Sequence, residues 1–192
     1  MELWLARHGE TEWTLSKQHT SVTDIPLTPN GEEQARQLGS RLRDATFDVV
    51  VSSPAIRARH TAELAGFGDR VEIDEDFVEY RYGEYEGITT AEIRKTRPDW
   101  DLWRDGNPGG ETTPEVAARA DRVIERIQAR GGEAALVFGH GHMSRVTAAR
   151  WLGMDGTAGR YLIMQTATLS IIGVEHGHPA IRLWNDASHL IG

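Results

Sequence analysis

Two histidines, His8 and His140, each follow a short apolar run and each precede a glycine. The runs at residues 3–6 and 135–138 have the composition of buried strands. Ligands of open α/β sheets bind at the carboxyl ends of the strands, so we expect the two imidazoles to meet in one pocket. Arg7 directly precedes His8. We therefore expect the pocket to bind an anion, because a guanidinium group binds phosphate or carboxylate through paired hydrogen bonds.

His8 has the features of a nucleophile that attacks phosphorus. A neutral imidazole is nucleophilic near pH 7 and can form a covalent intermediate. Gly9 is expected to let a backbone amide approach the anion closely, since glycine has no side chain. Taken alone, the motif also fits a histidine at a strand end that only bonds the backbone.

Arg57 lies one turn into a helix that we expect to begin at Pro54, after the strand at residues 47–52. The first turn of a helix favours phosphate through its free amide groups and its dipole. Arg57 can reach back over that end of the helix and add its charge. A solvated surface arginine is the alternative interpretation of the same spacing.

Glu79, Glu84 and Glu86 lie among tyrosines and glycines in one short segment. Burial against aromatic surface favours the protonated form of a carboxyl group, which suits a general acid that protonates a leaving oxygen. An ordinary turn with exposed acids is the alternative.

The segment His140-Gly141-His142 offers two kinds of chemistry. His140 can donate a hydrogen bond to a phosphoryl group, and the helix that follows adds amide donors. His140 and His142 also form a His-x-His pattern that fits a metal-dependent hydrolase. That alternative needs further ligands, and the sequence contains neither H-x-x-x-H nor H-x-x-E-H.

Strand–helix alternation along the chain predicts the elements that position these residues. It indicates an α/β fold of three layers, α/β/α, with a mainly parallel central sheet covered on both faces. We expect one domain over residues 1–192, with a long loop at residues 7–28. Expected strands are 2–6, 47–52, 71–73, 135–139 and a late hairpin of 167–174 and 180–183. Expected helices begin at Pro29, Pro54, Thr113 and Met143, and Thr90 is expected to cap a further helix.

Composition excludes several classes of protein. The 192 residues contain no cysteine, so neither a disulfide nor a thiolate zinc site contributes. The net charge is −8 and no block of Lys or Arg occurs, which argues against a nucleic-acid partner. No run approaches the roughly 18 apolar residues of a membrane span, and no signal peptide is evident. We therefore expect a cytoplasmic protein without a membrane partner.

Taken together, the motifs resemble those of the histidine phosphatase superfamily, the phosphoglycerate-mutase-like proteins, and occur in the same order. The matching segments are Arg7-His8-Gly9-Glu10-Thr11, Pro26-Leu27-Thr28-Pro29-Asn30-Gly31, residues 52–62 with Arg57, Tyr82-Gly83-Glu84-Tyr85-Glu86-Gly87, and His140-Gly141.

The resemblance implies a phosphoglycerate-mutase-like fold and a catalytic set of five residues. His8 would become phosphorylated, while Arg7, Arg57 and His140 would hold the phosphoryl group. Glu79 matches the family's proton donor, the glutamate four residues before the glycine of the aromatic–glycine step. The family needs neither a metal nor an organic cofactor.

The same resemblance favours a phosphatase over a mutase-type phosphotransferase, which stays open as an alternative. Mutases carry Asn where this chain has Thr14, and Thr-Gly-Trp-x-Asp where it reads Thr20-Ser21-Val22-Thr23-Asp24. They are also longer before the second His-Gly.

A narrower similarity, to small acid phosphatases and sugar-bisphosphate phosphatases, predicts a small phosphorylated metabolite as substrate. A non-catalytic phosphate-ester binding module and a homodimer are left open. The predicted substrate-binding set is Arg7, Thr14, Thr20, Ser21, Arg57, His140, Gly141 and His142.

Overall fold

The central sheet has six strands in the order β3-β2-β4-β1-β5-β6, and the computed structural model describes residues 1–190. The first four strands of the chain run parallel, whereas β5 pairs antiparallel with both β1 and β6. This mainly parallel arrangement agrees with the sequence prediction. The strands are β1 (Glu2–Arg7), β2 (Val49–Ser52), β3 (Glu72–Ile73), β4 (Ala134–Gly139), β5 (Leu169–Glu175) and β6 (His178–Asp186).

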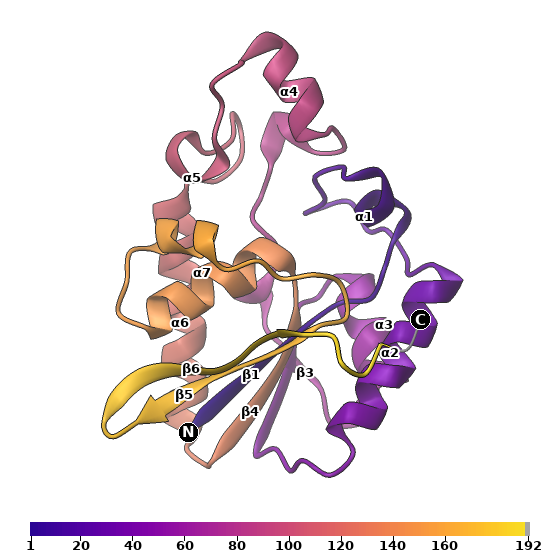
Figure 1. Ribbon diagram of the computed structural model, residues 1–192, viewed down its shortest axis with the longest axis vertical. Coiled ribbons are helices and arrows are strands. Elements are labelled where there is room, and N and C mark those ends of the chain that lie inside the picture. Colours follow the sequence, from indigo (N-terminus) through magenta and orange to yellow (C-terminus); the bar gives the residue numbers. More distant parts are fainter. Residues whose placement is uncertain (191–192) are drawn as a thin grey trace.

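Two pairs of helices cover the two faces of the sheet (Figure 1). Successive side chains of a strand point to opposite faces. Val50 and Leu136 therefore pack with α2 and α3, whereas Val51 and Val137 pack with α6 and α7. The expected three-layer architecture is confirmed. The helices are α2 (Pro29–Leu42), α3 (Ile56–Leu64), α6 (Thr113–Arg130) and α7 (Gly141–Trp151).

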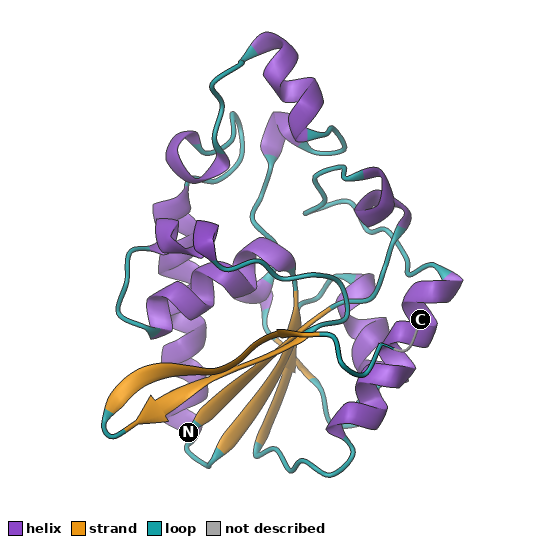
Figure 2. Cartoon of the chain, viewed as in Figure 1, coloured by secondary structure: helices purple, strands orange, loops and turns teal. Residues whose placement is uncertain are grey.

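Short helices and loops gather beyond the carboxyl ends of β1, β2 and β4 (Figure 2). One of them, α1 (Glu12–Ser16), falls inside the segment that the sequence predicts to be a loop. Thr11 and Thr14 form a capping box that stabilises this single turn of helix. The others are α4 (Thr90–Thr96), α5 (Leu102–Asp105) and the 3-10 turns η1 (Glu75–Phe77), η2 (Gly83–Tyr85) and η3 (Gly156–Tyr161).

Several boundaries differ from the sequence prediction: β1 ends one residue later, and β2, α3 and β5 each begin two residues later. Three further differences have a cause in the contacts of the folded chain. The N-cap of α4 is Thr89 rather than Thr90, because Thr89 forms the capping box with Glu92. Helix α7 begins at Gly141 rather than Met143, because a carboxylate from another segment accepts its first amides. Strand β6 is longer than the predicted 180–183, since it stays paired with β5 over most of its length. Within residues 1–190, no helix has the length and apolarity needed to cross a membrane.

Candidate active site

The two histidines meet at the carboxyl edge of the sheet because their strands are neighbours. Arg7 at the end of β1 pairs with Gly139 at the end of β4. His8 and His140, which follow these two residues, therefore lie side by side. The ring centroids of His8 and His140 are 5.3 Å apart. The structure thus brings together the two residues that the sequence analysis placed at one pocket.

His8 is held as a neutral imidazole with one free nitrogen. Its side chain is buried, and burial lowers its pKa well below the usual value, with the charges of Arg57 and Arg7 adding to the shift. Nδ1 lies 2.7 Å from the carbonyl oxygen of Gly9 and donates its proton there. The lone pair therefore resides on Nε2, which is the arrangement a nucleophile needs.

Gly9 does not place its amide against an anion, as the sequence analysis expected. Its amide donates to Oγ1 of Thr61 at 3.1 Å, so that amide is not available to an anion. A Cβ at this position would overlap the backbone carbonyl of Gly31. Glycine is therefore required by the close approach of two backbone segments, which fixes the turn after His8.

Arg57 is buried and Arg7 is half-buried, and neither guanidinium group forms an ion pair with a carboxylate in the described part of the chain. Nη1 of Arg7 donates to the carbonyl of Met164 at 2.5 Å. The Nε atoms of both arginines are buried without a hydrogen-bond partner. Burial lowers the pKa of both guanidinium groups. Buried charges are normally paired, so these two groups indicate a site for an anion.

The loop at residues 20–23 fixes Arg57 from one side. Nη1 of Arg57 donates to Thr23 O at 3.1 Å, and Nη2 donates to Ser21 O at 3.2 Å and to Thr20 O at 3.4 Å. The carboxylate of Glu86 holds the same loop from the other side, because it accepts from the amides of Ser21 and Thr23 at 2.8 and 3.0 Å. Glu86 thereby supports the carbonyl groups that orient Arg57.

Ser21 differs from the expectation that it binds substrate. Its hydroxyl donates to Glu86 at 2.5 Å and accepts from the amide of Tyr82 at 3.3 Å. The side chain is buried and belongs to the support of the loop rather than to the cavity lining. The partner that causes this orientation lies 65 positions away in sequence.

His140 is bonded at one nitrogen and free at the other. Nε2 lies 2.7 Å from Oγ of Ser53, whose oxygen also accepts from the amide of Ala55 at 3.3 Å. The hydroxyl proton of Ser53 can therefore point to Nε2, which leaves the ring proton on Nδ1. That Nδ1 is buried and without a partner among residues 1–190. Burial lowers the pKa of His140 well below its usual value, so the ring is a neutral donor.

Of the three candidate glutamates, only Glu79 faces the site. Glu84 is exposed, and Glu86 bonds the loop described above. The carboxyl oxygens of Glu79 accept from the amides of Met143 at 2.8 Å and His142 at 3.0 Å. The start of α7 therefore orients this carboxyl group.

The buried ion pair of Arg119 and Glu111 stabilises the backbone segment that contains Glu79. Arg119 donates twice to the carboxylate of Glu111, at 2.7 Å each. Its remaining donors reach the carbonyls of Asp76, Val78 and Glu79 at 2.5, 2.9 and 3.3 Å. Sequence analysis did not connect Arg119 with residues 76–79, because those residues lie 40–43 positions earlier in the chain.

A cavity of about 270 Å³ opens above His8 and Glu79. Four of the predicted substrate-binding residues line it together with Arg7: Thr14, Thr20, Gly141 and His142. Arg57 and His140 lie outside this lining. Besides His8 and Glu79, the lining contains seven residues outside the predicted substrate-binding set: Trp13, Lys17, Gln18, His19, Tyr82, Arg145 and Met164.

The metal-dependent alternative finds little support in the geometry. His140 bonds Ser53, whereas Nδ1 of His142 lies 2.7 Å from the hydroxyl of Tyr82. Within the described residues, no group of three or more His, Asp or Glu side chains is arranged to hold a metal ion.

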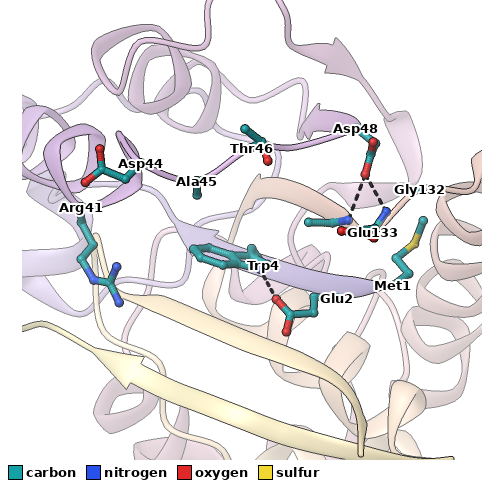
Figure 3. A pocket seen from close by; sticks show the side chains of 11 residues that line it. Met1, Glu2, Trp4, Arg41, Asp44, Ala45, Thr46, Asp48, Gly132 and Glu133 are labelled. Atoms are coloured by element: carbon teal, nitrogen blue, oxygen red, sulfur yellow. Dashed lines mark hydrogen bonds between the residues drawn. The ribbon is translucent and has the colours of Figure 1, made fainter.

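A larger cavity, of about 910 Å³, lies at the opposite end of the strands and has the wrong charge for a phosphate. Figure 3 shows the carboxylates of Glu2, Asp44 and Asp48 around Trp4. Arg41 is the one basic side chain in its lining. An anion is therefore expected at the smaller cavity beside His8.

Comparisons with known proteins identify relatives that cover most of the chain. The sequence model of the family described as histidine phosphatase superfamily (branch 1) matches residues 3–187. An acid phosphatase of Mycobacterium tuberculosis is 38% identical over 178 residues, which cover 91% of this chain and 87% of the relative. A sedoheptulose 1,7-bisphosphatase of Saccharomyces cerevisiae is 39% identical over 181 residues, which cover 78% of this chain and 67% of that protein.

A solved structure of a Mycobacterium tuberculosis open reading frame superposes with a TM-score of 0.89. It is 36% identical in sequence, and the match covers 96% of each chain. The phosphoglycerate-mutase-like fold expected from the sequence is thereby confirmed.

Proposed function

Because the chain belongs to the histidine phosphatase superfamily, branch 1, we propose that it hydrolyses phosphate monoesters of small metabolites through a phosphohistidine at His8. The observation that carries the proposal is the free Nε2 of a neutral His8 beside the guanidinium groups of Arg7 and Arg57, which form no ion pair with a carboxylate among residues 1–190. Relatives named acid phosphatase and sedoheptulose 1,7-bisphosphatase support the same reaction class.

In the first step, Nε2 of His8 attacks phosphorus in line with the leaving oxygen. The N–P bond forms as the P–O bond breaks, and Glu79 in its protonated form gives its proton to the leaving oxygen. Arg7 and Arg57 stabilise the charge on the equatorial oxygens, and Nδ1 of His140 donates one hydrogen bond to them.

In the second step, water attacks the phosphohistidine. The carboxylate of Glu79 takes a proton from the water, the N–P bond breaks, and inorganic phosphate leaves with His8 restored. The same carboxyl group thus acts as acid and then as base, and the cycle uses no metal or organic cofactor.

The size of the cavity favours a small substrate. Its volume of about 270 Å³ is near the lower end of ligand cavities, which span roughly 300–1,000 Å³. A phosphorylated metabolite of a few carbons fits this space better than a nucleotide or a phosphoprotein loop.

A panel of phosphorylated metabolites tests the proposal, with release of inorganic phosphate as the readout. The panel includes sugar bisphosphates, phosphoglycerates and p-nitrophenyl phosphate. We expect phosphate release that survives EDTA and is lost in His8→Ala. Conversion of 3- to 2-phosphoglycerate without phosphate release would instead identify a mutase. Ester binding without turnover across the panel would identify a binding module, and inhibition by EDTA reversed by metal would identify a metallohydrolase.

A further inference from the structure

Arg7 is held by the loop between η3 and β5, which comprises residues 163–168. The backbone amide of Arg7 donates to the carbonyl of Thr168 at 3.2 Å, and its Nη1 donates to the carbonyl of Met164 at 2.5 Å. Met164 also lines the cavity above His8. The 163–168 loop therefore fixes both the backbone and the guanidinium group of an arginine at the phosphoryl site.

The same loop contacts His8 through a residue in an unfavourable backbone conformation. The amide of Ala167 donates to the carbonyl of His8 at 3.0 Å. Ala167 is buried and has a φ of 55°, in the left-handed region that is unfavourable for a residue with a Cβ atom. Such a conformation persists only where surrounding contacts enforce it. The contacts that hold Ala167 thus bear on the position of His8.

A bulge in β6 turns two side chains toward this loop. The pairing of β5 with β6 shifts register between Leu169 and Ile171, so that Ser170 faces both Trp184 and Asn185. Asn185 has a φ of 55°, and its amide donates to Oγ of Ser170 at 2.9 Å. Bulges bend a strand locally and redirect its side chains.

Both side chains at the bulge bond the backbone of the 163–168 loop. Oδ1 of Asn185 accepts from the amide of Gln165 at 2.7 Å. Nε1 of Trp184 donates to the carbonyl of Ile163 at 2.6 Å. The first half of the loop is therefore attached to β6 at two points.

The turn after β6 adds a contact from the imidazole of His189. Its Nε2 lies 2.8 Å from the carbonyl of Ala167 and donates its proton there. Both backbone polar groups of the left-handed residue are thus bonded, the amide to His8 and the carbonyl to His189. His189 itself does not belong to the lining of the cavity.

We propose that Asn185 and His189 are positioning residues for the phosphoryl site. Through the 163–168 loop they hold Arg7 against the phosphoryl oxygens and keep His8 in line for attack on phosphorus. Neither residue lines the cavity, so their effect on the reaction passes through the loop. The inference rests on the proposed function, because it names residues that support the same site.

A matched pair of variants at His189 tests the proposal. His189→Gln keeps a nitrogen that can donate to the carbonyl of Ala167, whereas His189→Leu removes the donor and keeps an apolar side chain. Trp151→Phe is the control, because it also removes a donor to a backbone carbonyl, that of Gly173 on β5. Calorimetry measures the dissociation constant of inorganic phosphate, and turnover of p-nitrophenyl phosphate gives kcat and KM.

We expect His189→Leu to weaken phosphate binding by roughly fivefold, because a carbonyl that held the loop loses its donor. We expect kcat to fall by roughly tenfold, because a small displacement of a nucleophile slows the chemical step. His189→Gln and Trp151→Phe should keep both values near those of the wild type. Unchanged phosphate affinity and kcat in His189→Leu, or losses of the same size in Trp151→Phe, would overturn the proposal.

Asn185 allows a second pair, because its left-handed conformation is compatible with both replacements. Asn185→Gly removes the acceptor of the Gln165 amide without steric cost to the backbone. Asn185→Asp keeps an oxygen acceptor and tolerates the same conformation. Phosphate should bind more weakly to Asn185→Gly than to Asn185→Asp. Equal affinities of these two variants would contradict the role of Asn185.

Phosphate binding separates this inference from the proposed function. Failure of the proposed function abolishes phosphate release from every ester, but the calorimetric comparison of His189→Leu with His189→Gln needs no turnover. Equal phosphate affinities of these two variants would contradict the positioning role of His189 even in an active phosphatase.

Discussion

Oγ of Ser53 lies 2.7 Å from Nε2 of His140, and this contact determines which nitrogen of the ring faces the phosphoryl site. With Nε2 accepting, the proton resides on Nδ1, which is buried and without another partner in the described chain. Ser53 is thus a positioning residue that keeps His140 in the donor tautomer.

Ser53→Ala should therefore lower kcat by about tenfold, because the tautomer of His140 is no longer fixed and a buried nitrogen loses its partner. The pH profile of kcat should also change, while KM changes less. Ser52→Ala is the matched control, since Ser52 is equally buried but its hydroxyl donates to the neighbouring backbone. Equal kinetics of the two variants would refute the role given to Ser53.

Glu86→Gln should weaken the support of Arg57. In the wild type, the two carboxylate oxygens of Glu86 accept hydrogen bonds from two amides and a hydroxyl of the 20–23 loop. A glutamine has only one accepting oxygen in its side chain, because the other position is an NH₂ donor. We expect a rise in KM of about fivefold, and a loss that is less than additive with Arg57→Lys, since both changes act on one network. Glu84→Gln, at an exposed position, is the control. Full additivity of the two losses would show that Glu86 does not act through Arg57.

The pair Glu111–Arg119 should matter more for stability than any surface pair. Arg119→Met leaves a buried carboxylate without its cation, which typically costs about 3–5 kcal/mol in the free energy of unfolding. Arg122→Met removes a solvent-screened pair and should lower the free energy of unfolding much less. Urea unfolding measures both changes. Similar losses in the two variants would contradict the distinction.

Because three of its histidines are buried, we expect the protein to lose stability in mild acid. The pKa of His8, His140 and His142 is lower in the folded chain than the usual 6.5, chiefly because of burial. As the pH falls below that value, the unfolded chain takes up protons that the folded chain does not. Each such histidine then contributes a loss of up to about 1.4 kcal/mol per pH unit.

Urea unfolding between pH 7.5 and 5 measures this dependence. His8→Asn should make the slope shallower, because one proton-binding difference is removed. His178→Asn, at an exposed position on the β5–β6 hairpin, should leave it unchanged. A wild-type stability that does not fall over this range would contradict the burial effect.

The parts of the fold that sequence analysis predicted depend on local signals. Thr28 and Pro29 start α2 as expected, because a threonine N-cap and a proline in the first turn need no distant partner. His8 and His140 converge as predicted, because strand ends at one edge of a parallel sheet are brought together by topology alone.

The parts that it did not predict depend on contacts between distant segments. Ser21 turns to Glu86, and α7 begins early because Glu79 accepts its first amides. Arg145 has no distinctive spacing in the sequence, and only the folded chain shows that it lines the same cavity as His8 and Glu79. Such partners cannot be assigned from spacing, since many acids along the chain are equally available.

The account centres on a covalent bond between phosphorus and Nε2 of His8. Rapid quenching in base during turnover of a labelled ester, followed by peptide mass spectrometry, tests it most directly, because phosphohistidine survives base. We predict label on the peptide that contains His8, lost when unlabelled ester is added before the quench and absent in His8→Ala. Full turnover without label on His8, or turnover by His8→Ala at the wild-type rate, would contradict the account.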